Sequence, residues 1–208
     1  YDAVREESLS PVKRRFVEKT FRYFRRHGAE LSPEGKQKLA EIESELSVIT
    51  TKFSQNVLDS TNEFELLIEN EADVAGLPPS ALAAARESAK SKGRTGYRFT
   101  LHEPSYFAVM TYLDNRSIRE QVWRAYNTRA SSGKYDNREI ARRILELRRR
   151  KANLLGYADF ADFTTEERMA KSGRKALQFV ESLRERTEPA FRKETESLVA
   201  FRRELEGP

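Results

Sequence analysis

The fold of this chain is decided by residues 97–130, which read YRFTLHEPSYFAVMTYLDNRSIREQVWRAYNTRA. The stretch opens with apolar residues that alternate with polar ones from Tyr97 to Leu101, the period-two pattern of a half-buried strand. Pro104 ends that strand and suits the first turn of a short helix. Ser117 is followed three residues later by Glu120, so we expect a capping box in which Ser117 caps a second helix.

A second strand is predicted upstream at Phe64–Glu69. There the apolar residues change from the spacing of a helix to the alternation of a strand. Its natural partner is the strand at Tyr97–Leu101. Between the two lie a forced turn at residues 76–79 and an alanine-rich helix from Ser80 to about Lys92. We therefore expect a small sheet of two or three strands with a helix crossing between them.

Two helices are predicted before this sheet. Ser10 and Pro11 begin the first, which runs to His27 and should turn four apolar residues inward and its arginines outward; the apolar set is Val12, Phe16, Tyr23 and Phe24. The second covers residues 33–61 and carries a coiled-coil-like seam at Leu39, Ile42, Leu46, Ile49, Phe53 and Val57. This helix is expected to pair with a neighbour.

Further helices are predicted after residue 130. Asp136 and Glu139 have capping-box spacing at the start of a helix that stops at Gly156. Residues 157–169 read as an aromatic-rich connection. Ser172 should cap the last helix, which Pro189 should kink. The fold class is therefore mainly α, with long antiparallel helices and one small β-sheet, and residues 62–103 are a candidate sub-division of the chain 1–208.

The composition excludes several classes of protein. Among 208 residues there is no cysteine, so a disulfide framework and a thiolate metal site are excluded. No apolar run reaches the length of a membrane span, and the N-terminus lacks a signal-peptide pattern, so we expect a cytoplasmic protein without a membrane partner. The net charge of +5 arises from 38 basic and 33 acidic residues that are interleaved, which favours a solvated helical surface over a nucleic-acid interface.

Candidate catalytic and metal-binding residues are few. The two histidines are His27 and His102, and His102-Glu103 begins like the zinc-peptidase motif His-Glu-x-x-His. The fifth position is Tyr106, and Pro104 interrupts the helix that the motif needs. His27 beside Gly28 suits a helix C-terminus. We assign no catalytic, cofactor-binding or metal-ligating residue to this chain.

Other charged groups also have ordinary interpretations. Carboxylate pairs such as Glu41/Glu45 and Glu65/Glu69 are usually solvated on exposed elements. The densest basic patch, which we call the arginine patch, consists of Arg142, Arg143, Arg148, Arg149, Arg150 and Lys151. Glu146 can neutralise part of it, although phosphate binding is an alternative. Trp123, one residue off its apolar stripe, either widens the buried face or marks an interdomain contact.

Short sequence motifs spread over nearly the whole chain resemble one family. They are Asn56–Thr61, Gly76–Pro78, Ser80–Ala85, Pro104–Tyr106, Val109–Tyr112, Arg124–Tyr126, Thr128–Ser131, Asp136-Asn137, Leu154–Gly156 and Met169-Ala170. These motifs are similar to those of the oligopeptidase A branch of the thimet-type zinc oligopeptidases, peptidase family M3.

The resemblance implies a zinc-dependent oligopeptidase with two largely helical lobes around a channel for short peptides. One zinc ion would be held by a His-Glu-x-x-His helix and a further glutamate in a later part of the chain. This segment would be the helical wall before that part and would be inactive alone, with short peptides and the remaining catalytic lobe as partners. Both chain ends read as cuts inside a longer polypeptide.

A second hypothesis needs no catalysis. The chain could be a helical binding module for nucleic acid or a protein partner, using the seam 39–57 or the arginine patch. Affinity for nucleic acid that falls steeply with salt would support this hypothesis. A zinc motif downstream in a longer reading frame would favour the peptidase.

Overall fold

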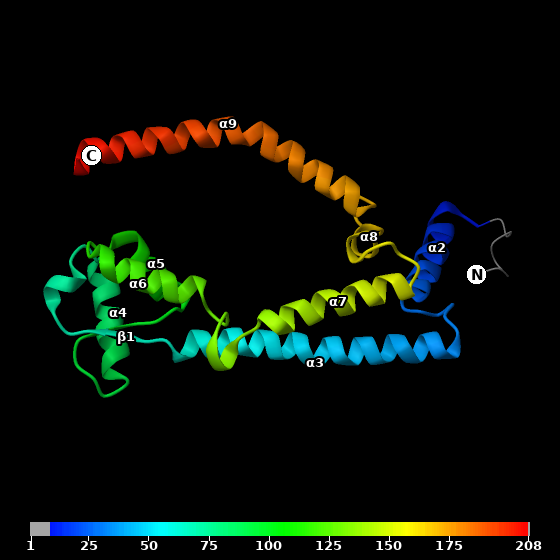
Figure 1. Ribbon diagram of the computed structural model, residues 1–208, viewed down its shortest axis with the longest axis horizontal. Helices are drawn as coiled ribbons and strands as arrows, with labels where there is room; N and C mark the ends of the chain where they lie inside the picture. Colours follow the sequence, from blue (N-terminus) through cyan, green and yellow to red (C-terminus); the bar gives the residue numbers. More distant parts are fainter. Residues whose placement is uncertain (1–8, 208) are drawn as a thin grey trace. The chain divides into compact units, whose positions relative to one another are not determined.

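The structure is a computed structural model that describes residues 9–207. It is mainly helical (Figure 1). The chain divides into two compact units. One unit comprises residues 43–146, and the other comprises residues 1–42 together with 147–208. Helices α3 (Pro33–Glu63) and α7 (Arg138–Leu154) each run from one unit into the other. The predicted fold class is confirmed.

The small sheet lies in the unit of residues 43–146. Strand β1 (Leu66–Ile68) pairs antiparallel with β2 (Tyr97–Phe99), and Leu66 lies opposite Phe99. Both strands fall within the predicted segments, where the hydrophobic period switches. Gly96 precedes β2 with φ +91°, and a Cβ there would lie 2.5 Å from the carbonyl oxygen of Ile68. Only glycine allows this close approach without strain.

The segment between the strands contains the predicted helix. A 3-10 helix, η1 (Glu71–Val74), follows β1, and α4 (Pro79–Lys90) then packs against β2. The alanine-rich composition of α4 has a structural reason, since Ala85 and Ala89 are buried and their small side chains let the helix approach the strand closely.

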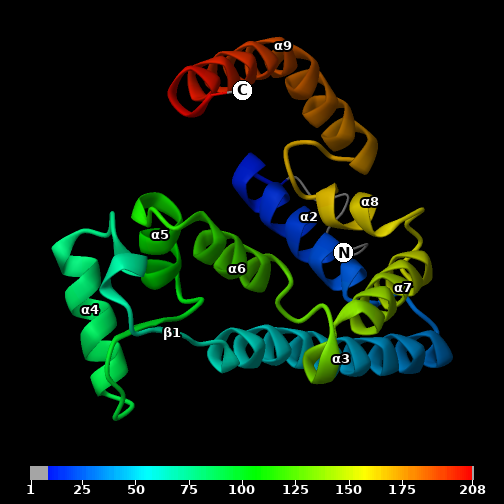
Figure 2. The same ribbon diagram turned by 60° about the vertical axis from the view of Figure 1, so that its left-hand side comes forward.

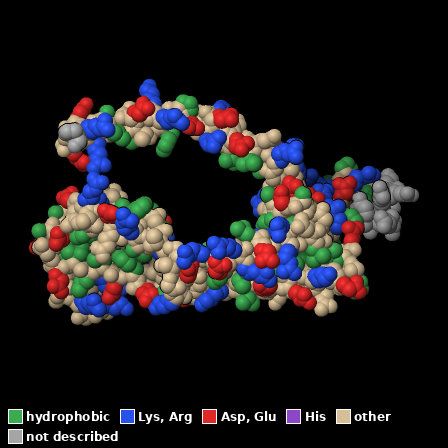
Figure 3. Space-filling model, viewed as in Figure 1, with side chains coloured by type: hydrophobic (Ala, Val, Ile, Leu, Met, Phe, Trp, Pro, Cys, Tyr) green, Lys and Arg blue, Asp and Glu red, His purple; other side chains and the backbone are tan. Residues whose placement is uncertain are grey.

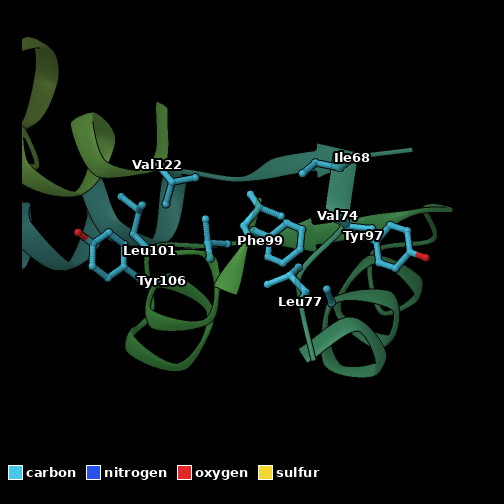
Figure 4. Close-up of a cluster of buried hydrophobic side chains, with 11 residues drawn as sticks. Ile68, Val74, Leu77, Tyr97, Phe99, Leu101, Tyr106 and Val122 are labelled. Atoms are coloured by element: carbon cyan, nitrogen blue, oxygen red, sulfur yellow. The ribbon is translucent and has the colours of Figure 1, made fainter. Parts of the chain in front are cut away.

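One hydrophobic core holds this unit together (Figure 4). It combines both strands with η1, α4, α5 (Glu103–Tyr112) and α6 (Arg116–Asn127). Val109, Leu113 and Val122 are almost fully buried within it. Burial of such a side chain contributes about 1.5–3 kcal/mol, so these contacts dominate the packing of α5 on α6. Trp123, by contrast, is 47% exposed and does not widen the buried face.

The predicted cap of α6 is wrong by two residues. The side-chain oxygen of Asn115 accepts from the backbone N–H of Ile118 at 3.3 Å. Ser117 donates its hydroxyl to that same oxygen, at 2.7 Å, and lies inside the helix. Asn115 takes the role because its amide nitrogen also donates to Asp73 at 2.9 Å, which fixes the side chain in capping position.

Helices α3 and α7 pair antiparallel within this unit (Figure 1, Figure 2). Asn56 donates to Asn137 at 2.8 Å, and Arg143 donates to both carboxylate oxygens of Glu45 at 2.6 and 2.8 Å. The prediction that this long helix pairs with a neighbour is thereby confirmed, through polar residues outside the predicted seam. The 3-10 helix η2 (Gly133–Tyr135) precedes α7.

The predicted capping box at Asp136 does not form. The backbone N–H of Asp136 donates to Gly133, and Glu139 pairs with Arg142 instead of reaching back. Asp136 accepts from the backbone and side chain of Arg138, and these hydrogen bonds lower its pKa to about 2.

In the other unit, the predicted orientation of α2 (Pro11–Arg26) is wrong. Val12, Phe16, Tyr23 and Phe24 are 56–79% exposed. The side that faces the rest of the unit carries arginines, which pair with glutamates at 166 and 167. An amphipathic pattern identifies an apolar face, but it does not reveal whether this chain supplies the surface that covers it.

The C-terminal part of this unit agrees with prediction apart from one added helix. The connection at residues 157–169 contains a short helix, α8 (Phe160–Thr165), capped by Asp159, whose side chain accepts from the backbone of Asp162 at 2.8 Å. Ser172 caps α9 (Gly173–Glu206), as predicted. Pro189 lies inside α9, which stays continuous and bends along its length (Figure 2).

Candidate functional site

His102 lies at the N-cap position of α5, where β2 gives way to the helix. Its carbonyl oxygen accepts the first helical hydrogen bond, from the backbone N–H of Tyr106. The ring of Tyr106 is buried and stacks on Tyr126 with centroids 3.9 Å apart. The fifth position of the His-Glu-x-x-His motif is therefore occupied by Tyr106, a buried aromatic residue. No second histidine lies one turn away from His102 on α5.

His27 has a local structural role at the end of α2. Its Nδ1 lies 2.7 Å from the carbonyl oxygen of Tyr23, to which the protonated nitrogen donates, and its ring lies 4.2 Å from that of Tyr23. The bond satisfies a carbonyl in the last turn of the helix. Within residues 9–207, no group of three or more histidine, aspartate or glutamate side chains is arranged to hold a metal ion.

A cavity of about 220 Å³ lies in the 43–146 unit. Alanines of α4 and α5 line it together with Phe99. Its polar lining is formed by Ser88, Arg98, Thr100, His102 and Ser105. Arg98 donates to Glu65 at 2.8 Å and to Ser88 at 2.9 Å. The hydrogen bond from Arg98 lowers the pKa of Glu65, and the charge of Arg94 lowers it further by a smaller amount. The arginine at the edge of the cavity is thus paired with a carboxylate and a serine of the same unit, and the cavity has the character of a mainly apolar recess.

The arginine patch does not form a single cationic surface. Arg142 pairs with Glu139, and Arg143 pairs with Glu45 and Glu146. These hydrogen bonds raise the pKa of Arg143 above its ordinary value. Arg148 lies over the ring of Phe160 at 5.2 Å, and Lys151 lies over Phe163 at 5.5 Å. Most members of the patch are thus engaged by carboxylates or aromatic rings of the same chain.

Sequence reasoning missed a cluster around Glu166. This carboxylate accepts from Arg25 at 2.8 Å, from Arg26 at 2.7 Å and from the hydroxyl of Tyr157 at 2.6 Å. Burial alone would raise the pKa of Glu166, but the hydrogen bonds from Tyr157 and Arg26 outweigh it and lower the pKa. Burial is the larger cause that raises the pKa of Tyr157, and the hydrogen bond to Glu166 is the next. The adjacent arginines of α2 were the sequence signal for this cluster. They did not identify their partner, which lies 140 residues later in the chain.

The chain matches known proteins in two comparisons. The model of "Peptidase family M3" matches residues 109–207. Oligopeptidase A of Haemophilus influenzae is 45% identical over 197 residues, which are 92% of this chain and 29% of that protein. This chain belongs to peptidase family M3. Other M3 relatives include oligopeptidase A of Salmonella typhimurium, 40% identical over 93% of this chain and 29% of its own length.

A plant relative extends the match over almost the whole chain. The probable cytosolic oligopeptidase A of Arabidopsis thaliana is 40% identical over 212 residues, covering 97% of this chain and 30% of its own length. This M3 chain therefore spans under a third of the length of these curated relatives. No helix within residues 9–207 is long and apolar enough to cross a membrane.

Proposed function

We propose that this chain is a non-catalytic helical segment of a zinc-dependent oligopeptidase that hydrolyses short peptides in the cytoplasm. In this proposal the 208 residues form part of the wall of the substrate channel, and the zinc ligands lie elsewhere in a longer polypeptide. The observation that carries the proposal is the 45% identity to an oligopeptidase A over 92% of the chain. The names of the relatives support a peptide substrate, and their greater length supports a separate catalytic part.

Within the part of the chain that the structure describes, the residues do not fit a catalytic zinc ion. Such a site needs about three protein ligands and an open position for water. His27 holds the Tyr23 carbonyl and His102 starts α5, so the two imidazoles lie in separate units of the chain. Glu65 and Glu166 are committed to arginines. When bound, zinc would polarise the scissile carbonyl and activate a water molecule, and this chemistry belongs to residues outside this chain.

In this proposal the chain forms a side of the substrate channel and orients the peptide. Holding a substrate in the correct geometry lowers the entropy cost of the reaction even when the wall supplies no reacting group. The hydrophobic core of residues 43–146 and the hydrogen bond between Asn56 and Asn137 support such a role.

A peptidase assay tests this proposal. The complete reading frame that contains this chain, and the 208-residue chain alone, are incubated with a quenched-fluorescence oligopeptide with and without a chelator. We expect cleavage by the complete protein that the chelator abolishes, and none by the 208-residue chain. A complete protein that is inert with zinc supplied would contradict the peptidase function.

A further inference from the structure

The cavity beside Phe99 is formed by one unit of the chain alone. All of the residues that line it lie between Ala81 and Ala108, inside the unit of residues 43–146. Its space exists because α4 presents small side chains there, including Ala84 and Ala85, where larger ones would fill it. The cavity is open to solvent, and Ala84 in its lining is exposed.

The size of the cavity suits one apolar side chain. A cavity of about 150 Å³ lined by aliphatic and aromatic residues admits a benzene molecule. The space of about 220 Å³ here therefore has room for a side chain such as that of leucine or phenylalanine, together with a small polar group. Phe99 and Pro104 stand beside the alanines in the lining, so the burial of an apolar side chain is favourable.

The polar groups of the lining can act as hydrogen-bond donors. The hydroxyl oxygen of Ser88 accepts from Arg98 at 2.9 Å. The hydroxyl oxygen of Ser105 accepts from the backbone N–H of Thr100 at 2.9 Å. Each hydroxyl thus keeps a hydrogen that it can donate, and Arg98 has N–H groups beyond the two that bond Glu65 and Ser88. A ligand that meets these groups needs acceptor oxygens.

The charge balance at the cavity favours an anion. Among the described residues that line it there is an arginine but no aspartate or glutamate. Glu65 neutralises part of the charge of Arg98, but Arg94 lies 3.3 Å from the same carboxylate, so two arginines share one acid. Figure 3 shows basic and acidic side chains interleaved over the visible face of the molecule, so this positive excess is a local property.

We propose that this cavity binds an apolar carboxylate with the size of one residue, either a free amino acid such as phenylalanine or the C-terminal residue of a short peptide. The apolar side chain fills the space against Phe99 and the alanines, and the carboxylate accepts from Arg98 and Ser88. Charge-assisted hydrogen bonds of this kind are stronger than neutral ones. The inference goes beyond the proposed function, since it needs neither zinc nor peptide hydrolysis.

Methyl NMR of the complete protein, kept free of zinc by a chelator, tests the proposal. Alanine methyl groups are labelled with ¹³C, and the protein is titrated separately with N-acetylphenylalanine, phenylalanine, N-acetylphenylalanine amide and N-acetylalanine. We expect saturable shifts at Ala81, Ala85 and Ala108 with at least one of the first two probes, and binding of the last two that is weaker by about tenfold or more. Shifts with the acetylated carboxylate alone assign the site to a peptide C-terminus, and shifts with phenylalanine alone assign it to the free amino acid. No shift with either carboxylate, or equal binding of the amide, would overturn the proposal.

A matched pair of variants gives an independent measurement. Ala84→Leu enlarges a lining residue, and Ala83→Leu places the same side chain at the neighbouring exposed position of α4, which does not line the cavity. Leucine is a good helix former, so both variants should keep the melting temperature of the wild type. We expect Ala84→Leu to weaken binding about tenfold or more and Ala83→Leu to leave it unchanged. Equal binding by the two variants would contradict the site.

A third variant tests the hydrogen-bond donor. Ser88→Ala removes the hydroxyl and keeps a strong helix former in α4. We expect it to weaken binding of the carboxylate several-fold and to leave binding of the amide unchanged. An unchanged affinity for the carboxylate would overturn the role of Ser88.

Discussion

Asn56 and Asn137 form a buried amide pair, with 2.8 Å between Nδ2 of Asn56 and Oδ1 of Asn137. Asn137 also donates its own amide to the carbonyl oxygen of Phe53 at 2.9 Å, so one side chain joins the start of α7 to two turns of α3. The side-chain oxygen of Asn56 has no partner among the described residues. The pair therefore fixes the register of the two helices through Asn137.

Replacement of Asn137 by alanine should destabilise the protein. The variant leaves the buried Asn56 amide without its acceptor and removes the additional bond from Asn137 to the Phe53 carbonyl, at a cost of about 1–3 kcal/mol. Urea unfolding of the wild type and of Asn137→Ala measures the change in free energy. Gln55→Ala is the control because Gln55 is exposed and its side chain donates to Asp59, one turn along the same helix. An equal loss in the two variants would show that the buried pair has no special role.

The helix α6 should depend on Asn115 and not on Ser117. Asn115→Ala removes the cap of the helix and the contact to Asp73, and should cost about 1–2 kcal/mol. Ser117→Ala removes an exposed hydroxyl bond and should cost a few tenths of a kcal/mol. Denaturation midpoints distinguish the two, and a larger loss for Ser117→Ala would restore the capping box that the sequence predicted.

Gly96 should tolerate alanine much less well than Gly93. Both have positive φ, at +91° and +68°, so both substitutions carry the cost of the left-handed backbone. At Gly96 the new Cβ also meets the Ile68 carbonyl, whereas at Gly93 nothing lies within 4 Å. Backbone strain of this type costs about 1–3 kcal/mol, and the clash at Gly96 should add to it. Equal melting temperatures for the two variants would mean that the pairing of β1 with β2 differs from the one described.

The Glu166 cluster should make stability depend on acid pH. The folded-state pKa of Glu166 lies below its ordinary value of 4.5, so the contribution is complete above pH 4.5 and is lost as the pH falls through the folded-state pKa. Because these groups are partly exposed, we expect about 1 kcal/mol. Stability curves between pH 3 and 7 should be flatter for Glu166→Gln than for wild type. Glu181→Gln, on the exposed surface of α9, should follow wild type; a wild-type curve that matches Glu166→Gln would contradict the coupling.

The sequence predicted those features that depend on neighbouring residues. The switch of period at Phe64–Glu69 and Tyr97–Leu101 located both strands, since alternation follows directly from strand geometry. Ser172 was found as a cap because it directly precedes the last helix, and its hydroxyl accepts from the backbone N–H of Lys175. At α6, Asn115 and Ser117 can both cap, and only the distant contact with Asp73 decides between them.

Features that depend on residues far apart in the chain could not be predicted from local sequence patterns. The outward apolar face of α2 follows from the pairing of Arg22, Arg25 and Arg26 with residues some 140 positions later. The cavity beside Phe99 depends on the docking of α4 against β2. The ordinary structural roles of His27 and His102, in contrast, follow from the glycine and the proline beside them, and the structure places both residues at helix ends.

The measurement that tests the central claim most directly is the zinc content of the purified proteins. The complete protein and the 208-residue chain are each loaded with zinc, dialysed and analysed for bound metal. Our account predicts about one tightly bound zinc ion per complete chain and none in the 208-residue chain. Stoichiometric zinc in the 208-residue chain, or its absence from the complete protein, would contradict the claim that this chain is a non-catalytic segment of a zinc oligopeptidase.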